Sequence, residues 1–236
     1  MKRPNVAVII PAYNEEKSIG LVVAEIPKDC IQNVVVVDNG SSDGTASVAA
    51  RHGAKIVSES RRGYGSACLA GISHLPDETE LVVFMDADYS DYPHEIKALL
   101  AAQFHHQADL VVGSRVLGQR EPGSLTTQQR LGNWLSTWII KRLYGFSYSD
   151  LGPFRLIRRQ ALERLEMQDQ NYGWTVEMQV KALQHQMKIV EVPVSYRRRI
   201  GKSKVSGTVS GSFKAGMKIL WVIAKLAFQN PSRRKR

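Results

Sequence analysis

Five short apolar runs constrain the fold of this chain more than any other feature. They are rich in β-branched residues, and stretches with helical character separate them. Strands that are apolar on both faces are typical of a parallel sheet covered by helices on both sides. The sequence therefore predicts an α/β fold with a mainly parallel sheet. The predicted strands are residues 6–10, 34–38, 54–57, 81–85 and 109–113, and the predicted helices between them are residues 15–26, 43–52, 64–74 and 94–105.

Polar residues gather where these predicted strands end. The first strand is followed by PAYNEE (11–16), the second by DNGSSDGT (38–45), the fourth by DADYSD (86–91) and the fifth by GSR (113–115). In open α/β sheets, ligands bind beyond the carboxyl ends of the strands. We therefore expect these four segments to meet in one binding site.

Three acids, Asp86, Asp88 and Asp91, follow the fourth apolar run. Buried carboxylates are costly unless they are paired or coordinated. Asp86 and Asp88 point to the same side if the chain is extended, because side chains alternate with a period of two. Two carboxylates suit Mg²⁺ or Mn²⁺, which also takes water and substrate phosphates as ligands. The alternative is that these acids only form a turn or a helix cap.

The second half of the chain has a different character. Residues 128–146 carry a helical apolar stripe, and residues 200–212 are rich in Gly, Ser and Lys and are expected to be mobile unless a ligand binds them. The remaining expected elements are a loop with a short strand at 150–159, a helix at 174–186, a strand pair or edge strand at 188–197, and an apolar helix with three lysines at 213–228.

The positive charge is concentrated near the C-terminus. The net charge is +10, and residues 197–236 hold twelve of the 32 Lys and Arg but no Asp or Glu, which leaves 20 basic against 22 acidic residues elsewhere. Such a segment suits an anionic partner: nucleic acid, phosphate groups or an anionic membrane.

The two cysteines, Cys30 and Cys68, form no CxxC pattern, so we expect reduced thiols in a cytoplasmic protein. No apolar run is long enough for a signal peptide or a transmembrane helix.

Seven segments together resemble the family-2 glycosyltransferases with the GT-A fold, in the branch of the dolichyl- and polyprenyl-phosphate mannose or glucose synthases. They are VIIPAYNEE, VVVVDNGSSDGT, RRGYGSA, VVFMDADYSDYP, GSR, DLGPFRLIRR and VPVSYRRRIGKSKVSGT. The resemblance covers most of the chain and implies a Rossmann-like GT-A domain at 1–199. Within it, 1–118 would be the nucleotide-sugar half and 119–199 the acceptor half, followed by a basic loop and an amphipathic C-terminal helix at 200–236.

The resemblance implies a donor site for a nucleotide sugar of the UDP-glucose or GDP-mannose type. Asp86 and Asp88 would hold Mg²⁺ or Mn²⁺ against the donor diphosphate, where the cation neutralises the charge of the leaving group. Ser90 stands where many relatives have Gln, which leaves the identity of the cation open. Alternatives remain for Asp38, which could form an Asx-turn, and for Gly63, which could form a turn before a helix. The other implied donor-site residues are Pro11, Ala12, Tyr13, Glu15, Asp38, Gly63 and Ala87.

The resemblance also implies a basic acceptor site. A phosphate acceptor is already an anion, so it needs cations to position it, whereas a hydroxyl acceptor usually needs a general base. Asp150 could be that catalytic base, or it could orient Arg155. Arg130 could instead belong to a solvated helix face, and Trp174 and Glu177 would either shape the acceptor pocket or lie in a core helix. The residues that would grip the acceptor phosphate are Arg115, Arg130, Arg199, Lys202 and Lys204.

These implications lead to one expected function and two alternatives. We expect a metal-dependent inverting transfer of a hexose to a polyprenyl or dolichyl phosphate, with residues 213–228 lying peripherally on the cytoplasmic face of a membrane. One alternative is transfer to a soluble or glycan hydroxyl acceptor. The other is a nucleic-acid-binding protein that uses the basic segment, but the chain lacks an RNP pattern and a helix-turn-helix signature. We therefore expect no nucleic acid partner.

Overall fold

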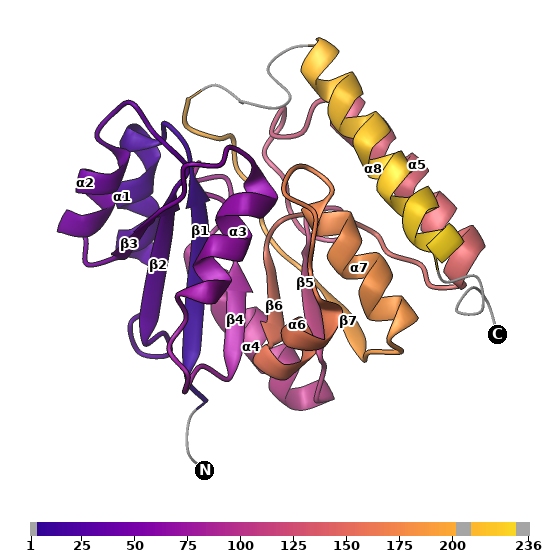
Figure 1. Cartoon of the computed structure of the whole chain (residues 1–236), viewed down its shortest axis with the longest axis horizontal. Coiled ribbons are helices and arrows are strands. Elements are labelled where there is room, and N and C mark those ends of the chain that lie inside the picture. The colour runs from indigo at the N-terminus through magenta and orange to yellow at the C-terminus, as the bar shows by residue number, and fades with distance from the viewer. Residues whose placement is uncertain (1–3, 202–208, 230–236) are drawn as a thin grey trace.

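A seven-stranded sheet in the order β3-β2-β1-β4-β6-β5-β7 forms the centre of the molecule (Figure 1). The structure is a computed structural model, and it describes residues 4–201 and 209–229. Among the described strands, β6 alone runs antiparallel to its two neighbours, β4 and β5, and the other pairs are parallel. The strands are β1 (Val6–Ala12), β2 (Asn33–Asp38), β3 (Lys55–Ser58), β4 (Leu81–Phe84), β5 (Leu110–Ser114), β6 (Arg155–Arg158) and β7 (Ile189–Pro193).

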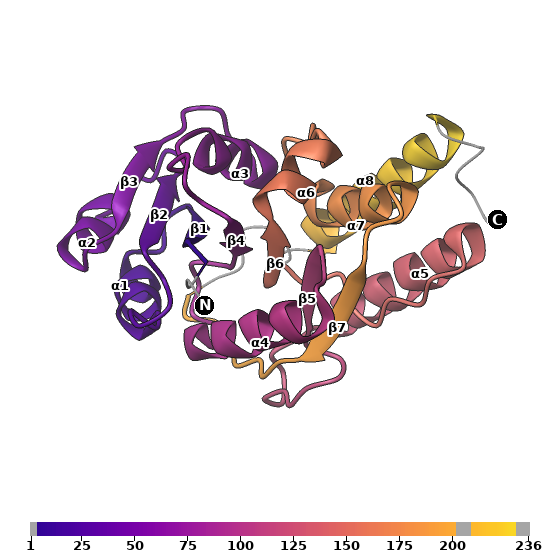
Figure 2. The ribbon, with the colours of Figure 1, turned by 90° about the horizontal axis from the view of Figure 1, so that it is seen from below.

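Helices cover both faces of this sheet, as Figure 2 shows. The buried cluster around Val8 and Ile10 packs against α1, α2 and α4, whereas the cluster around Ile9 and Phe84 packs against α3, α6 and α7. This two-sided burial explains the continuous apolar runs and confirms the predicted α/β class. The helices are α1 (Glu16–Glu25), α2 (Thr45–Arg51), α3 (Tyr64–Ser73), α4 (Ile96–His106), α5 (Thr127–Tyr144), α6 (Arg159–Leu165), α7 (Trp174–Gln184) and α8 (Val209–Gln229), with a short 3₁₀ turn, η1 (Pro93–Glu95), before α4.

The predicted elements are present, with ends that differ by a few residues. Two features of the second half were not predicted, namely the helix α6 and the antiparallel insertion of β6 between β4 and β5. The segment at 188–197 is an edge strand, β7, which pairs in parallel with β5.

The long helices α5 and α8 lie side by side at one end of the molecule (Figure 1). α5 begins with a capping box formed by Thr126 and Gln129 and ends at Gly145, which has a φ of 79°. α8 starts four residues before the predicted boundary at 213. Its buried residues Val222, Ile223 and Leu226 join the same core cluster as α7, so α8 is part of the folded domain. Within residues 4–201 and 209–229, no helix combines the length and hydropathy that crossing a membrane requires.

Candidate active site

A cavity of about 480 Å³ opens at the carboxyl ends of β1 and β4. These strands are neighbours in the sheet, and Phe84, the last residue of β4, pairs with Ile9 of β1. The polar segments that follow them are therefore brought together, as the sequence predicts. The lining includes eight of the nine residues that were predicted for the donor site: Pro11, Ala12, Tyr13, Glu15, Gly63, Asp86, Ala87 and Asp88.

Hydrogen bonds between two turns fix the position of Glu15. The backbone N–H of Asn14 donates to Ser41 Oγ at 2.9 Å, and that of Glu15 donates to Thr45 Oγ1 at 2.8 Å. In return, the Ser42 N–H donates to Asn14 Oδ1 at 2.8 Å. The PAYNEE turn after β1 is thus held by the DNGSSDGT turn after β2, which sets Glu15 at the cavity wall.

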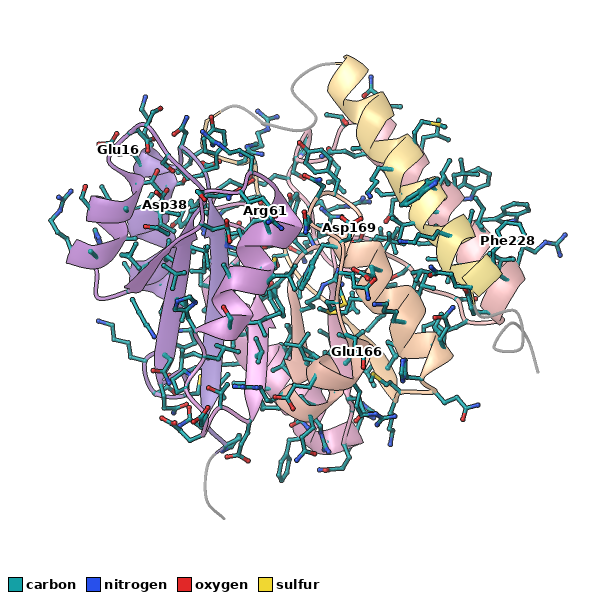
Figure 3. All side chains as sticks on the ribbon, viewed as in Figure 1. Glu16, Asp38, Arg61, Glu166, Asp169 and Phe228 are labelled. Atoms are coloured by element: carbon teal, nitrogen blue, oxygen red, sulfur yellow. The ribbon has the colours of Figure 1, made fainter. Side chains whose placement is uncertain are left out.

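Asp38 is the predicted donor residue that is not among the described residues lining this cavity. Its Oδ1 accepts a hydrogen bond from the Ser41 N–H at 3.1 Å, three positions along the chain. This local bond resembles the predicted Asx-turn, in which the side chain bonds two positions on. Figure 3 labels Asp38 at the end of β2. Asn39 lines the cavity instead, and its amide donates to the carbonyls of Glu59 and Arg61 while accepting from the Gly63 N–H. Asn39 was not predicted, because the donor contact was assigned to the acid before it, Asp38. That contact of Asp38 stays a prediction.

The loop before α3 contributes Arg62 and Gly63 to the cavity. The Arg62 guanidinium lies 3.9 Å from the centre of the Tyr13 ring, within range of a cation–π interaction. A Cβ atom at Gly63 would overlap with the carbonyl oxygen of Gln170, and one at Gly65 would overlap with that of Asp169. Gly63 therefore lines the cavity and allows the helix start to pack closely, and its contact with the donor stays a prediction.

The three acids after β4 form a cluster in which Asp86 is half-buried and the other two are buried. Asp88 and Asp91 are 6% and 1% exposed. Burial, and then the charge of Asp88, raises the pKa of Asp86 to about 7. Burial, followed by the charges of Asp86 and Asp88, raises the pKa of Asp91 well above its usual value. Asp91 Oδ1 is buried without a hydrogen-bond partner among the described residues, so the cluster carries negative charge that is only partly compensated.

This cluster fits a divalent cation that takes further ligands from elsewhere. Asp86 and Asp88 line the same cavity, so they do not face apart. Ser90 supports Asp88, because its N–H and its hydroxyl donate to Asp88 Oδ1 at 3.0 and 2.5 Å. In the described part of the chain, no group of three or more His, Cys, Asp or Glu is arranged to hold a metal ion. A cation here would therefore complete its shell with water and substrate oxygens, as Mg²⁺ does at diphosphates.

The segment after β7 lies across the DxD turn, the turn that contains Asp86 and Asp88. The N–H of Arg197 donates to Ser90 O at 3.0 Å, and that of Ile200 donates to Asp88 O at 2.9 Å. The Arg197 guanidinium lies 3.2 Å from the centre of the Tyr89 ring. This clamp brings Arg199 to the acids, where its Nη2 lies 2.8 Å from Glu15 Oε1 and its Nη1 lies 3.1 Å from Asp88 Oδ2.

A second cavity of about 620 Å³ joins the first at Asp86, Asp88 and Arg199, which line both. Arg115 and Arg130, two of the predicted acceptor-phosphate residues, line it. Arg130 is also exposed on α5, so it belongs both to the cavity and to a solvated face. Lys202 and Lys204 lie outside the described residues.

The second cavity is also lined by Arg120, which the sequence did not predict. It extends between α5 and α8, where it is lined by Trp134, Thr137, Ala215, Gly216 and Ile219.

Asp150 is a partner of Arg115, not of Arg155. Arg115 Nε lies 2.8 Å from Asp150 Oδ2, and Nη2 lies 2.9 Å from Oδ1. Burial alone would raise the pKa of Asp150, but the Arg115 charge and hydrogen bonds hold it below its usual value. The predicted Arg155 pairing is therefore wrong: Arg155 donates to the backbone carbonyls of Gly152, Pro153 and Thr175. With both oxygens engaged and the side chain fully buried, Asp150 is poorly placed to act as a general base.

The loop that carries Asp150 is held from three further elements. Glu191 of β7 accepts hydrogen bonds from the N–H of Ser149 at 2.9 Å and from that of Asp150 at 3.3 Å. Asn133 of α5 donates to Ser149 O at 3.0 Å, and Gln179 of α7 donates to Asp150 O at 3.0 Å. These positioning residues were not predicted either, because each lies in an apolar segment whose pattern predicts only a helix or a strand.

Trp174 and Glu177 belong to a core helix, which was the alternative prediction. Trp174 is 1% exposed and its ring centre lies 5.9 Å from that of Phe84. Glu177 accepts hydrogen bonds from the N–H groups of Gln168 and Asp169 and pairs with Lys181 at 2.8 Å. Thr175, which lies between them, lines the second cavity.

Residues 168–171 connect the first cavity to α8. The carbonyl of Gln170 accepts from the Ser66 N–H at the start of α3. The Asp169 carboxylate accepts from the N–H of Gly173 and pairs with Lys218 of α8 at 2.8 Å. Figure 3 labels Asp169 between α3 and α7. One short loop therefore contacts both the donor side and the C-terminal helix.

Comparison with known proteins agrees with this geometry. The family model described as "Glycosyl transferase family 2" matches residues 7–166. An uncharacterized glycosyltransferase of Mycobacterium tuberculosis is 40% identical over 89% of this chain and 94% of its own length. The undecaprenyl-phosphate mannosyltransferase of Micrococcus luteus is 30% identical over 87% of this chain and 89% of its own.

A solved structure shares the fold. The glucosyl-3-phosphoglycerate synthase of M. tuberculosis, in complex with Mn²⁺, UDP and glucosyl-3-phosphoglycerate, superposes with a TM-score of 0.76 at 19% identity, covering 94% of this chain and 80% of that one. This likeness confirms the predicted GT-A fold. The match of the family model over most of the chain, and the relative at 40% identity, show that the chain belongs to glycosyl transferase family 2.

Proposed function

We propose that this glycosyltransferase moves a hexose, with inversion, from a nucleoside diphosphate sugar to a polyprenyl phosphate at a membrane surface. The observation that best supports this is the meeting of two cavities at Asp86, Asp88 and Arg199. One cavity has the size for a nucleotide sugar, and the other combines arginines with an apolar slot. A donor and an amphipathic phosphate in these cavities would meet at the acids.

The first cavity would hold the donor. Tyr13 and Arg62 offer a stacked pair of planar groups at which a base can pack, and Glu15 lies at the wall. Asp86 and Asp88 would hold Mg²⁺ or Mn²⁺ against the diphosphate. When bound, the cation neutralises charge that develops on the leaving nucleoside diphosphate. The fold relative crystallised with Mn²⁺ and UDP supports this assignment.

The second cavity would hold the acceptor phosphate. Arg115 and Arg130 provide planar guanidinium groups, which match phosphate oxygens. Asp150 would fix the Arg115 fork through its two short contacts. Because the phosphate is already an anion, the transfer would need no general base, in agreement with the engaged state of Asp150. The undecaprenyl-phosphate mannosyltransferase among the relatives supports a lipid acceptor.

The outer surface of α5 and α8 would rest on the membrane. It exposes large apolar side chains next to cations, and the Trp221 ring lies between Lys218 and Lys225 at 4.6 and 5.2 Å. Such a surface suits the interface of an anionic bilayer. Figure 3 labels Phe228 near the end of α8, at the outer side of the molecule. The exposed apolar residues of this surface are Leu131, Trp134, Trp138, Met217, Trp221 and Phe228.

We further propose that residues 1–118 supply most of the donor site and 119–199 most of the acceptor site, with 200–236 as the basic membrane-facing segment on the cytoplasmic side. The second candidate acceptor is a soluble one. The same arginines would bind a small phosphorylated acceptor, and a fold relative was crystallised with phosphoglyceric acid.

A labelled transfer assay tests the proposal. A thermal-shift panel of nucleotide sugars with Mg²⁺ or Mn²⁺ first identifies the donor. The protein is then incubated with that labelled donor and a polyprenyl phosphate, and the mixture is extracted with butanol. Label in the butanol phase that depends on the lipid supports the proposal. Label that stays in the aqueous phase with every lipid phosphate, but moves to a soluble phosphorylated acceptor, supports the second candidate.

A further inference from the structure

The Arg199 side chain bridges two buried acids from different turns of the active site. Its contacts are Glu15, from the turn after β1, and Asp88, from the turn after β4, at 2.8 and 3.1 Å. Both acids are less than a tenth exposed. The guanidinium therefore occupies the boundary between the two cavities and supplies positive charge there.

The position of the guanidinium bears directly on Asp88. Asp88 Oδ1 accepts two hydrogen bonds from Ser90, and Oδ2 is the atom that faces Arg199. Oδ2 is thus the oxygen with room for another partner. A divalent cation on Oδ2 and a guanidinium 3.1 Å from the same atom would repel each other strongly in this buried setting.

The guanidinium is incompletely bonded where it lies. Arg199 Nε is buried without a hydrogen-bond partner among the described residues, which lowers the cost of moving the side chain. The backbone around it is fixed by the bonds from Arg197 N to Ser90 O and from Ile200 N to Asp88 O. The side chain can therefore turn while the main chain stays, and the second cavity, which Arg199 already lines, lies next to it.

We propose that Arg199 acts as an exchangeable counter-ion: it neutralises Asp88 before the donor binds, is displaced by the cation–nucleotide complex, and then turns to the acceptor phosphate. This inference rests on the proposed function and assigns Arg199 a role before that of gripping phosphate. It makes donor binding a condition for full acceptor affinity, because only the displaced guanidinium has its charge free for the acceptor. The donor would then bind first and the acceptor second.

The first step of this proposal is the displacement of Arg199 by the cation. Measuring Mn²⁺ binding to the full chain without nucleotide tests it. The free Mn²⁺ signal in electron paramagnetic resonance gives the affinity. Arg199→Met keeps a long side chain but removes the charge, and it should bind Mn²⁺ at least about tenfold more tightly than the wild type. Arg199→Gln should behave in the same way, which guards against a folding defect of one variant. Arg198→Met is the matched control, because the exposed Arg198 side chain donates to the Pro122 carbonyl and contacts neither Glu15 nor Asp88, and it should bind as the wild type does.

The outcomes separate this inference from the proposed function. If Asp88→Asn abolishes Mn²⁺ binding but Arg199→Met and Arg199→Gln bind no more tightly than the wild type, the exchange is overturned and the metal site stands. If Asp88→Asn binds Mn²⁺ as well as the wild type does, the metal site itself is wrong and both ideas fail.

The second step is the turn of Arg199 to the acceptor phosphate. Measuring the binding of farnesyl phosphate tests it. In the presence of Mn²⁺ and the nucleoside diphosphate chosen by the thermal-shift panel, the wild type should bind farnesyl phosphate at least about tenfold more tightly than without them. Arg199→Met should lose this gain. An equal affinity of the wild type with and without Mn²⁺ and nucleotide would overturn the transfer of Arg199 to the acceptor.

Discussion

Arg115 and Asp150 form a two-pronged ion pair at the wall of the second cavity, with Nε–Oδ2 and Nη2–Oδ1 distances of 2.8 and 2.9 Å. Fork-to-fork contacts of this kind fix the plane of a guanidinium as well as its position. Arg115 lines the cavity, and the buried Asp150 holds its guanidinium in place. The ion pair therefore gives Asp150 a positioning role, whereas the sequence alone also allowed a role as a general base.

Asp150→Asn should reduce kcat/KM for the lipid acceptor by about 100-fold, because the Arg115 fork loses its fixed orientation. The Arg115 charge and hydrogen bonds hold the pKa of Asp150 below its usual value, so the carboxylate stays ionised at neutral pH and should give no limb in the rate profile there. The variant should keep the shape of the wild-type pH–rate profile. Loss of one limb in Asp150→Asn would instead identify Asp150 as the base.

The same pair makes a prediction for stability. A depressed carboxylate pKa stabilises the fold above the unfolded-state pKa, and this contribution is lost as the pH falls through the folded-state value. Asp150→Asn should therefore cost roughly 3 kcal/mol at pH 7 and progressively less below about pH 4. Urea denaturation across this range measures the difference. A cost that is independent of pH would contradict the ion-pair explanation.

Asp88→Ala should lower transfer by at least about 10³-fold, since the proposed cation and the Ser90-supported carboxylate act together on the leaving group. Circular dichroism should show an intact fold, because Asp88 lies on a cavity and not within an apolar cluster. Full activity of this variant would refute the metal assignment.

Replacing Trp221 and Phe228 by Ser should weaken binding to anionic vesicles by at least about tenfold, because both side chains are exposed on the α8 surface. Flotation with phosphatidylglycerol vesicles measures this. Phe104→Ser is the control, since Phe104 is 64% exposed, between Trp221 at 53% and Phe228 at 77%, but lies on α4, and it should bind as the wild type does. Deleting residues 213–236 is a poorer test, because Val222, Ile223 and Leu226 belong to the core. Unchanged flotation of the double variant would remove the membrane surface from α8.

Gly65→Ala should destabilise the protein by about 2–3 kcal/mol, because the new Cβ would overlap with the backbone carbonyl of Asp169. Gly132→Ala in α5 is the matched control: nothing lies within 4 Å of its Cβ position, and alanine favours helix by up to about 1 kcal/mol. Thermal denaturation should therefore shift in opposite directions. Equal shifts would mean that the loop at 168–171 adapts to the methyl group.

The sequence predicted the strands, the sheet edge at which the first cavity lies and most of the residues that line this cavity, because each depends on a local pattern of apolar and polar residues. It did not predict the insertion of β6 or the partner of Asp150, since both depend on pairing between distant segments. The link between Arg199 and Glu15 joins residues 184 positions apart. Asp38 is a different case: its side chain accepts a local hydrogen bond from Ser41, and its contact with the donor stays a prediction.

The placement of β6 between β4 and β5 has a consequence for how the enzyme can be divided. A fragment ending at residue 118 would contain β4 and β5 but not the strand that joins them, so it would carry an unfilled gap and two unpaired edges. Separately expressed halves should therefore aggregate alone and regain structure only when mixed. The two cavities therefore lie at one continuous sheet, and any movement of one relative to the other would have to come from loops and side chains.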